Sequence, residues 1–288
     1  MTMTSSRPTT TASSAPPAPA HRPLPGLWRT SLARSASELR VFFRNPQSVV
    51  FTLALPVILL MIFGSIFSGK IEGTDTDFKQ YFVAGIVAAG IMSTAFTGLA
   101  INVALEREMG LIRRLAGSPM PKASYFVGKV VLVLVTSLLE ALILIALGTA
   151  LFGLDLPSDA DHWIAFGWIF VLGTAACALS GLAYTALIPS ANSAAAIVTP
   201  PFLVLQFISG VFFPFNQLPE WMQTTAGIFP LKWMTQGLRY VFLPDGFSAV
   251  EPGGVWNLPL IAMALGFWVL LAGFLTAITF KWRGPKVR

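Results

Sequence analysis

Six long runs of apolar residues, nearly free of charge, dominate this chain of 288 residues. A helix needs about 20 residues to cross the hydrocarbon core of a bilayer. In lipid each crossing segment must be helical, since every backbone N–H and C=O has to be paired within it. The runs predict an all-α membrane protein with six transmembrane helices, over about residues 49–67, 81–103, 125–152, 163–188, 194–213 and 258–280.

The composition and the prolines refine this prediction. Charged residues make up 11% of the chain, whereas a soluble domain carries about 25%. Residues 1–23 consist mostly of Thr, Ser, Pro and Ala, which predicts a disordered cytoplasmic tail before a transmembrane domain over 24–288. Pro200 and Pro201 lie inside the fifth run. They remove two backbone donors, so we expect them to break or kink that helix.

Lysine and arginine gather beside one set of connections. With a cytoplasmic N-terminus, fifteen of the nineteen basic residues fall on the cytoplasmic side, and Lys70, Lys79, Lys232 and Arg239 fall outside. The positive-inside rule favours this orientation, so we expect both termini to be cytoplasmic. Because the basic residues flank apolar runs, the net charge of +6 does not indicate a nucleic-acid partner.

Two further segments are neither spans nor plain loops. Residues 27–44 mix apolar side chains with arginines just before the first span, which is typical of a helix lying in the membrane interface; an ordinary basic flank is the alternative. The connection over about 214–257 predicts two short helices, around 219–228 and 231–242, separated by Phe229-Pro230. Its tryptophans suit the headgroup level, so we expect short re-entrant or outer-interface helices.

No set of residues for covalent chemistry is recognisable. The sequence contains no GxxxxGK[ST] phosphate loop, no HExxH and no CxxC, which are the patterns that cradle a nucleotide or hold a metal. Cys177 is the one cysteine, so a disulfide framework is excluded. We expect no enzyme activity, catalytic residue, metal or cofactor in this chain.

Glu140 is the acidic residue placed well inside a predicted span. An ionised acid at the bilayer centre costs about 2.5–3.5 kcal/mol on insertion scales. We therefore expect Glu140 to have a structural partner, to lie near the interface, or to serve transport. In the fourth run, Gly173, Cys177 and Gly181 recur every four residues, which indicates close helix packing.

The connection between the second and third spans carries an unusual charge pattern. Glu106 and Glu108 flank Arg107, and Arg113 and Arg114 follow. Gly117 and two prolines then end any helix. The pattern predicts an exposed two-turn helix able to contact a cytoplasmic partner. A basic stop-transfer loop, the alternative, explains the arginines but not the glutamates.

Two stretches resemble the type-2 ABC exporter permeases of bacteria. The first is Glu106-Arg107-Glu108, Gly110, Arg113-Arg114-Leu115, Ser118-Pro119-Met120 and Gly128-Lys129. The second is Ser209-Gly210, Pro214, Leu218-Pro219-Glu220-Trp221, Pro230-Leu231 and Arg239. Lys232-Trp233 departs from the Thr-Tyr or similar pair that the family often has. The resemblance covers about residues 25–283.

This resemblance implies a permease in the bacterial plasma membrane, with a second copy or a close paralogue as dimer partner. A separate cytoplasmic ABC ATPase, which binds ATP and Mg, would dock on the coupling residues. These are Glu106, Arg107, Glu108, Gly110, Arg113 and Arg114. The turn at 188–193 resembles a second cytoplasmic contact, and 27–44 resembles the connecting helix of the family.

In that family, spans two and five flank the central pathway. The residues of this chain at those places are Thr94, Phe96, Thr97, Gln206, Phe207 and Ser209; helix packing is the alternative role for each. An apolar and aromatic lining favours a drug, an antibiotic or other secondary metabolite, or a lipid, so drug efflux and antibiotic resistance are expected roles. The alternative function is an ion-coupled carrier without an ATPase, which needs inverted repeats and several buried charges.

Overall fold

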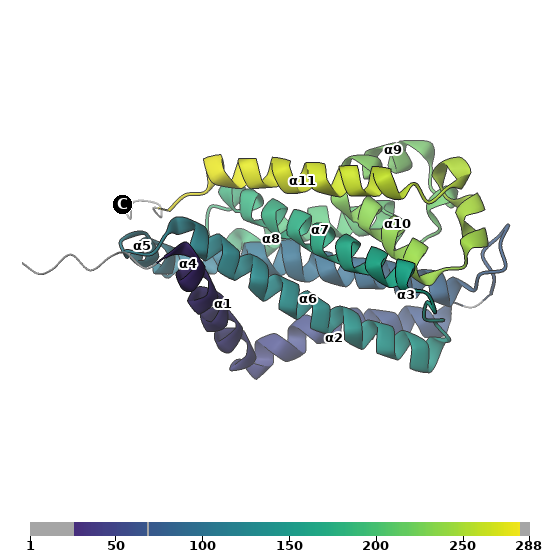
Figure 1. Ribbon diagram of the computed structural model, residues 1–288, viewed down its shortest axis with the longest axis horizontal. Coiled ribbons are helices and arrows are strands. Elements are labelled where there is room, and N and C mark those ends of the chain that lie inside the picture. Colours follow the sequence, from purple (N-terminus) through teal and green to yellow (C-terminus); the bar gives the residue numbers. More distant parts are fainter. Residues whose placement is uncertain (1–25, 68, 283–288) are drawn as a thin grey trace, which may run out of the picture.

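The computed structural model describes residues 26–67 and 69–282, and its long elements are all helices (Figure 1). Six of them in the described ranges are long and apolar enough to cross a membrane, and a further helix precedes them. The predicted fold class is confirmed. The tail predicted over 1–23 lies outside the described residues, and the division into tail and domain stays a prediction.

The predicted spans agree with the observed helices to within a few residues at most ends. The membrane-length helices are α2 (Pro46–Ile66), α3 (Phe78–Met92) continued by the π-helix η1 (Ser93–Gly98) and α4 (Leu99–Glu108), α6 (Lys122–Phe152), α7 (Ala160–Tyr184) with the 3-10 turn η2 (Thr185–Leu187), α8 (Ala191–Ile208) and α11 (Leu258–Thr279). The shorter helices are α1 (Leu27–Phe43), α5 (Leu111–Ala116), α9 (Glu220–Ile228) and α10 (Pro230–Phe242), with 3-10 turns at Phe215–Gln217, Asp245–Val250 and Pro252–Gly254.

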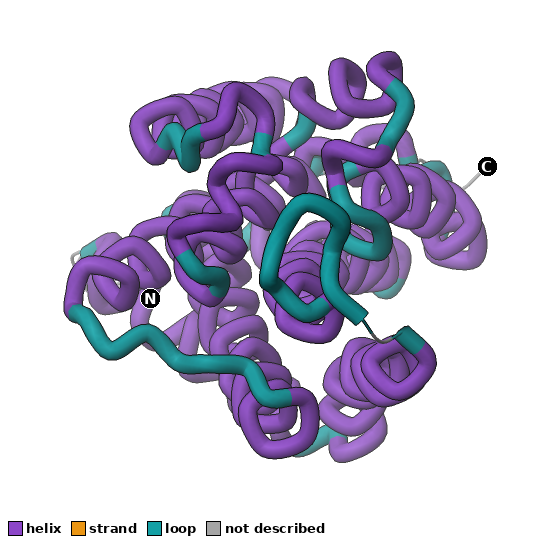
Figure 2. Tube along the Cα trace, turned by 90° about the vertical axis from the view of Figure 1, so that its right-hand side faces the viewer, coloured by secondary structure: helices purple, strands orange, loops and turns teal. Residues whose placement is uncertain are grey.

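The long helices run along one common direction between two distinct ends (Figures 1 and 2). One end holds α5, the start of α6 and the turn between α7 and α8. The other holds α9 and α10. We call these the α5 end and the α9 end. Helix α11 packs most extensively on α7, and α3 lies between α2, α6 and α10, so the second span forms the centre of the bundle.

Helix α1 is turned so that its polar side faces the protein. Ser31, Ser35 and Glu38 are buried, and α1 packs mainly against α6. Trp28, by contrast, is 77% exposed. Four other large apolar side chains of α1 are also exposed: Leu27, Leu32, Val41 and Phe43. The exposed side of α1 also carries Arg29, Ser37 and Arg40, and this mixture of apolar and basic side chains suits a helix that lies in the membrane interface.

Helix α8 overturns one of the two outcomes expected from its prolines, which were a break or a kink. It continues without interruption from Ala191 to Ile208 through Pro200 and Pro201, so the expected break does not occur. Membrane helices tolerate proline where neighbouring groups satisfy the freed carbonyls. The helix ends five residues earlier than predicted because Gly210 adopts φ +75°, a left-handed conformation that favours glycine.

Helix α10 is a core element rather than a surface helix. It packs between α3, α7 and α11. Its Arg239 is fully buried and donates to both carboxylate oxygens of Glu251, at 2.6 and 3.2 Å, and to the Tyr81 hydroxyl at 3.3 Å. Helix α9 stays at the surface, where Trp221 is exposed. The two short helices meet at Phe229-Pro230, as predicted.

Close packing along α7 is confirmed. A Cβ added to Gly181 would lie 2.8 Å from the carbonyl oxygen of Phe96 on η1, and one on Gly173 would lie 2.6 Å from the sulfur of Met234 on α10. Cys177 is buried between them. The absence of a side chain at Gly181 therefore lets the backbones of α7 and η1 come into contact, and that at Gly173 makes room for the Met234 side chain of α10.

Candidate functional site

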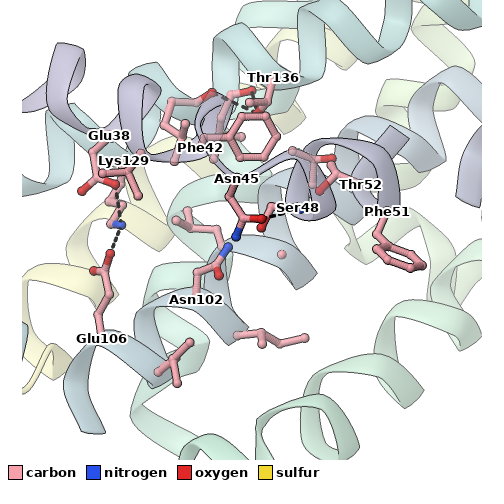
Figure 3. A pocket seen from close by; sticks show the side chains of 18 of the residues that line it. Glu38, Phe42, Asn45, Ser48, Phe51, Thr52, Asn102, Glu106, Lys129 and Thr136 are labelled. Atoms are coloured by element: carbon pink, nitrogen blue, oxygen red, sulfur yellow. Dashed lines mark hydrogen bonds and ion pairs between the residues drawn. The ribbon is translucent and has the colours of Figure 1, made fainter. Parts of the chain in front are cut away.

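At the α5 end, a buried ammonium group joins three helices. Lys129 on α6 is 2% exposed and donates to Glu106 at the end of α4 over 2.5 Å and to Glu38 on α1 over 3.0 Å (Figure 3). Arg34 pairs with the other oxygen of Glu38, and Tyr125 donates to the other oxygen of Glu106 at 2.9 Å. Two cations thus balance two carboxylates, and all four carboxylate oxygens have donors.

Arg107 and Glu108 join the two connections at this end of the bundle. The Arg107 guanidinium donates to the carbonyl oxygens of Thr185, at 3.0 Å, and Ile188. The Glu108 carboxylate accepts from the backbone N–H of Ala191 at 2.6 Å, at the N-terminus of α8, where a negative charge is favourable. A displacement of α4 would therefore be passed directly to the turn between α7 and α8.

The coupling residues fall into two groups on either side of Gly110. Glu106, Arg107 and Glu108 bind other helices, whereas Arg113 and Arg114 are exposed. Gly110, with φ +74°, separates α4 from α5, and a non-glycine residue in that conformation is strained by about 1–2 kcal/mol. Beyond it, Arg113 and Arg114 are exposed on the short helix α5, which Ile112 anchors through its buried side chain. Among the six coupling residues, Arg113 and Arg114 are therefore the exposed cations.

This arrangement differs from the single exposed helix that the charge pattern predicts. Glu106 and Arg107 complete the long second span and point into the protein. Sequence alone misses this because their partners, Lys129 and the carbonyls at 185 and 188, lie on other helices. The Gly128-Lys129 pair was visible in the sequence, but its partners were not. Lys129 binds Glu106, and Gly128 makes room for α1, since a Cβ there would lie 2.7 Å from Arg34.

Glu140 has a structural partner, Thr94, which lies in the π-helix η1 of the second span. It is 1% exposed, and its Oε2 accepts from the Thr94 hydroxyl at 2.7 Å. Its Oε1 has no hydrogen-bond partner among the described residues and lies 2.6 Å from where a Gly90 Cβ would be. Thr94 belongs to the π-helix, a form that is frequent at functional sites.

Two of the predicted pathway residues line a groove near the C-terminal end of α8. Gln206 and Phe207 border a cavity of about 290 Å³ between α2, α3 and α8. Gln206 is buried and Phe207 is half-exposed. Thr94 borders a second cavity toward the α5 end.

The other predicted pathway residues lie apart from both cavities. Phe96 is buried against Tyr184, with ring centroids 5.4 Å apart. The Ser209 side chain is fully buried and lacks a hydrogen-bond partner among the described residues, as does the Thr97 hydroxyl. The role of all six residues in transport stays a prediction.

Comparisons with known proteins agree on one family. The sequence profile of the ABC-2 type transporter family matches residues 32–243. The chain is 24% identical over 217 residues to the putative transport permease ycf38 of Porphyra purpurea, covering 73% of this chain and 72% of that protein.

Two bacterial relatives show the same similarity. The inner membrane transport permease YadH of Escherichia coli (strain K12) is 24% identical over 230 residues, which cover 76% of this chain and 87% of YadH. The probable multidrug ABC transporter permease YbhR of the same strain is 23% identical over 190 residues, covering 66% of this chain but 51% of YbhR. The matched regions include the α5 end described above.

Proposed function

The chain belongs to the ABC-2 type transporter family and is a multi-pass membrane permease subunit, and we propose that it exports a hydrophobic or amphiphilic compound across the plasma membrane. Members of this family lack a catalytic ATPase domain and rely on a partner ATPase. The ion-coupled carrier is therefore set aside. Cargo classes that fit are a drug, an antibiotic or other secondary metabolite, and a lipid.

The observation that carries this proposal is the brace formed by Arg107 and Glu108. It ties the end of the second span to the turn between α7 and α8. Energy from ATP has to enter such a chain through an interface, and a partner shifts a conformational equilibrium only by binding one state better. A push on α5 would reach two membrane helices at once through this brace.

The α5 end faces the cytoplasm in this proposal, and the partner ATPase, with ATP and Mg, binds there. Exposed Arg113 and Arg114 supply the charge for docking. The basic residues of this end support the orientation through the positive-inside rule. Export as the direction rests on the resemblance of residues 106–129 and 209–239 to the type-2 exporter permeases.

A second permease copy completes the pathway. The outward face of α8 carries Leu203, Val204 and Phe207, and that of α2 carries Phe51, Leu55 and Ile58, all exposed. The groove with Gln206 and Phe207 lies between these helices. A twofold partner on this face would enclose the groove between two copies, and the remaining apolar surface would contact lipid.

The test is reconstitution with the cognate ABC ATPase. We expect the permease to bind the ATPase and raise its hydrolysis rate in lipid, and R113A/R114A to weaken binding at least tenfold. Lys281→Ala is the matched control, since it removes an exposed cation beyond α11 at the same end. Retention of full binding by R113A/R114A, or equal loss with Lys281→Ala, would contradict docking on α5.

A second variant tests the residues that bind other helices, Glu106 and Glu108. Glu106→Ala/Glu108→Ala is expected to keep the arginines exposed but to uncouple hydrolysis from the permease, because it removes contacts to α6 and α8. Unchanged coupling in this variant would mean that the contacts of Glu106 and Glu108 do not transmit movement from the ATPase.

A further inference from the structure

A cavity of about 630 Å³ lies between the α1–α2 elbow, α4 and α6 (Figure 3). Pockets for drug-sized molecules span about 300–1,000 Å³, so a molecule of that size fits. Phe51 and Met109, which border the cavity, are more than half exposed. The cavity is therefore open to molecules that reach the protein near α1.

The charged part of the lining offers no net charge to a ligand. Glu38, Glu106 and Lys129 border the cavity, but each is already paired, and Arg34 supplies the second cation. An ionic ligand would have to separate one of these pairs. Separating a buried pair leaves an uncompensated charge, which is strongly unfavourable. Both cationic and anionic ligands are therefore disfavoured.

The uncharged part of the lining has spare hydrogen-bonding capacity. The Asn45 Oδ1 accepts from the backbone N–H of Ser48 at 3.3 Å, so the Asn45 amide hydrogens are free to donate. Asn102 on α4 borders the same cavity and is exposed, and its side chain points toward Asn45 (Figure 3). Amides of this kind both donate and accept.

Apolar side chains complete the lining around these amides. Phe42 and Phe51 come from the elbow, and Leu105 comes from α4. Thr52 and Thr94 add hydroxyl groups farther along the cavity toward the α9 end. The lining thus alternates apolar surface with uncharged polar groups, which selects a ligand with the same character.

We propose that this cavity is the entry site for an uncharged amphiphile that carries hydroxyl or carbonyl groups. Its oxygen atoms bind Asn45, Asn102 and Thr52, and its apolar body packs on Phe42, Phe51 and Leu105. This inference rests on the proposed export function and specifies the chemistry of the cargo.

The position of the cavity also relates cargo to coupling. Glu106 and Met109, which border it, belong to the segment that leads into α5. An occupant contacts the same end of α4 that Arg107 ties to the turn after α7. Binding of cargo therefore acts on the element that meets the ATPase, with no intervening helix.

The experiment compares three photoreactive probes that share one benzophenone-alkyl body. Their head groups are glycerol, which is uncharged, trimethylammonium and sulfonate. The permease is placed in phosphatidylcholine nanodiscs, irradiated with each probe, and digested for mass spectrometry. We expect the glycerol probe to label residues 41–52 and 98–109 at least fivefold more than either charged probe does.

Variants locate the interaction. N102L and T52V each keep a similar volume but remove hydrogen-bonding groups, and each is expected to lower labelling by the glycerol probe at least fivefold. Thr149→Val is the control, because that hydroxyl bonds only to carbonyls of its own helix; it is expected to leave labelling unchanged. The head-group comparison on the unaltered protein stands even if a variant fails to fold.

Four results would overturn the proposal. These are equal labelling by all three probes, preference for a charged probe, labelling spread evenly over lipid-facing positions such as Leu270 and Phe274, and no labelling because lipid or a second copy fills the cavity. Labelling requires no ATPase. Loss of ATPase binding would thus refute the proposed export function separately from the cavity.

Discussion

Lys129 on α6 lies 2.5 Å from Glu106 at the end of α4, and both side chains are largely buried. A charge pair in this position holds the second and third spans together at the α5 end. Because Lys129 also reaches Glu38, it fixes α1 to the same point.

Lys129→Met is expected to destabilise the permease strongly. It leaves two carboxylates sharing one remaining cation, and breaking a buried pair in this way costs about 3–5 kcal/mol. The melting temperature in detergent measures the effect. K129M/E106Q should recover part of the loss, because Glu38 keeps Arg34 and the second charge is gone. A double variant no better than K129M would refute the pairing.

Arg107→Lys is expected to weaken coupling although it keeps the charge. The guanidinium reaches the carbonyls of Thr185 and Ile188 together, and an ammonium cannot reproduce that planar fork. Hydrogen bonds to charged groups contribute about 1.5–3 kcal/mol. ATPase stimulation by the reconstituted permease should fall, whereas Arg113→Lys, on the exposed helix α5, should keep it. Equal stimulation by both variants would rule out the brace.

Gly181→Ala and Gly167→Ala form a matched pair on α7. The new methyl at 181 would meet backbone atoms of Phe96 at 2.8 and 3.0 Å, while nothing lies within 4 Å at 167. Overpacking costs about 1–3 kcal/mol, so G181A should melt lower than wild type. G167A should melt at the same temperature or higher, since alanine favours a helix by up to about 1 kcal/mol. The reverse order would show that the α7–η1 contact is looser than described.

Glu140→Gln is expected to be tolerated. The amide oxygen can still accept from Thr94, and an uncharged group suits a site away from water. Thr94→Val should be worse, because it leaves the carboxyl without its partner, at about 1–3 kcal/mol. Melting and ATPase stimulation would be measured for both. Loss of stimulation in E140Q, with T94V unaffected, would show that the ionised carboxylate is required.

Lys232→Met is expected to stabilise the protein near neutral pH. Burial lowers the pKa of Lys232 from 10.5 to about 8, so protonation is harder in the folded state than in the unfolded chain. Folding stability therefore rises with pH between about 8 and 10.5, and the full penalty, roughly 3 kcal/mol, applies below pH 8.

The measurement is the melting temperature of K232M against wild type at pH 7 and pH 10. The difference should be largest at pH 7 and should shrink at pH 10. Lys281→Met, which changes an exposed lysine, should show no such dependence. A K232M advantage that stays constant with pH would contradict a buried ammonium at this site.

The spans were predictable because lipid forces apolar runs into helices, whatever their neighbours are. The boundary between the two short helices was predictable from Phe229-Pro230, because proline cannot continue a preceding helix without kinking or breaking it. The uninterrupted course of α8 through Pro200 and Pro201 was not, because it depends on what surrounds the freed carbonyls.

The site was only half predictable, for a related reason. The charge pattern indicated that residues 106–114 form a special segment, and Arg113 and Arg114 are indeed exposed. The inward direction of Glu106 and Arg107 depends on Lys129 and on the turn after α7. Such pairings between separate helices have no local signal in one sequence.

The π-helix at Ser93–Gly98 also determines how this chain should be aligned with its relatives. Such a stretch closes i→i+5 hydrogen bonds and so takes up one residue more than an α-helix does. A relative whose second span is α-helical throughout aligns through a one-residue gap within 93–98. If the gap is left out, Arg107 is assigned to a position about 100° away around the helix axis, where it would not face the carbonyls of Thr185 and Ile188.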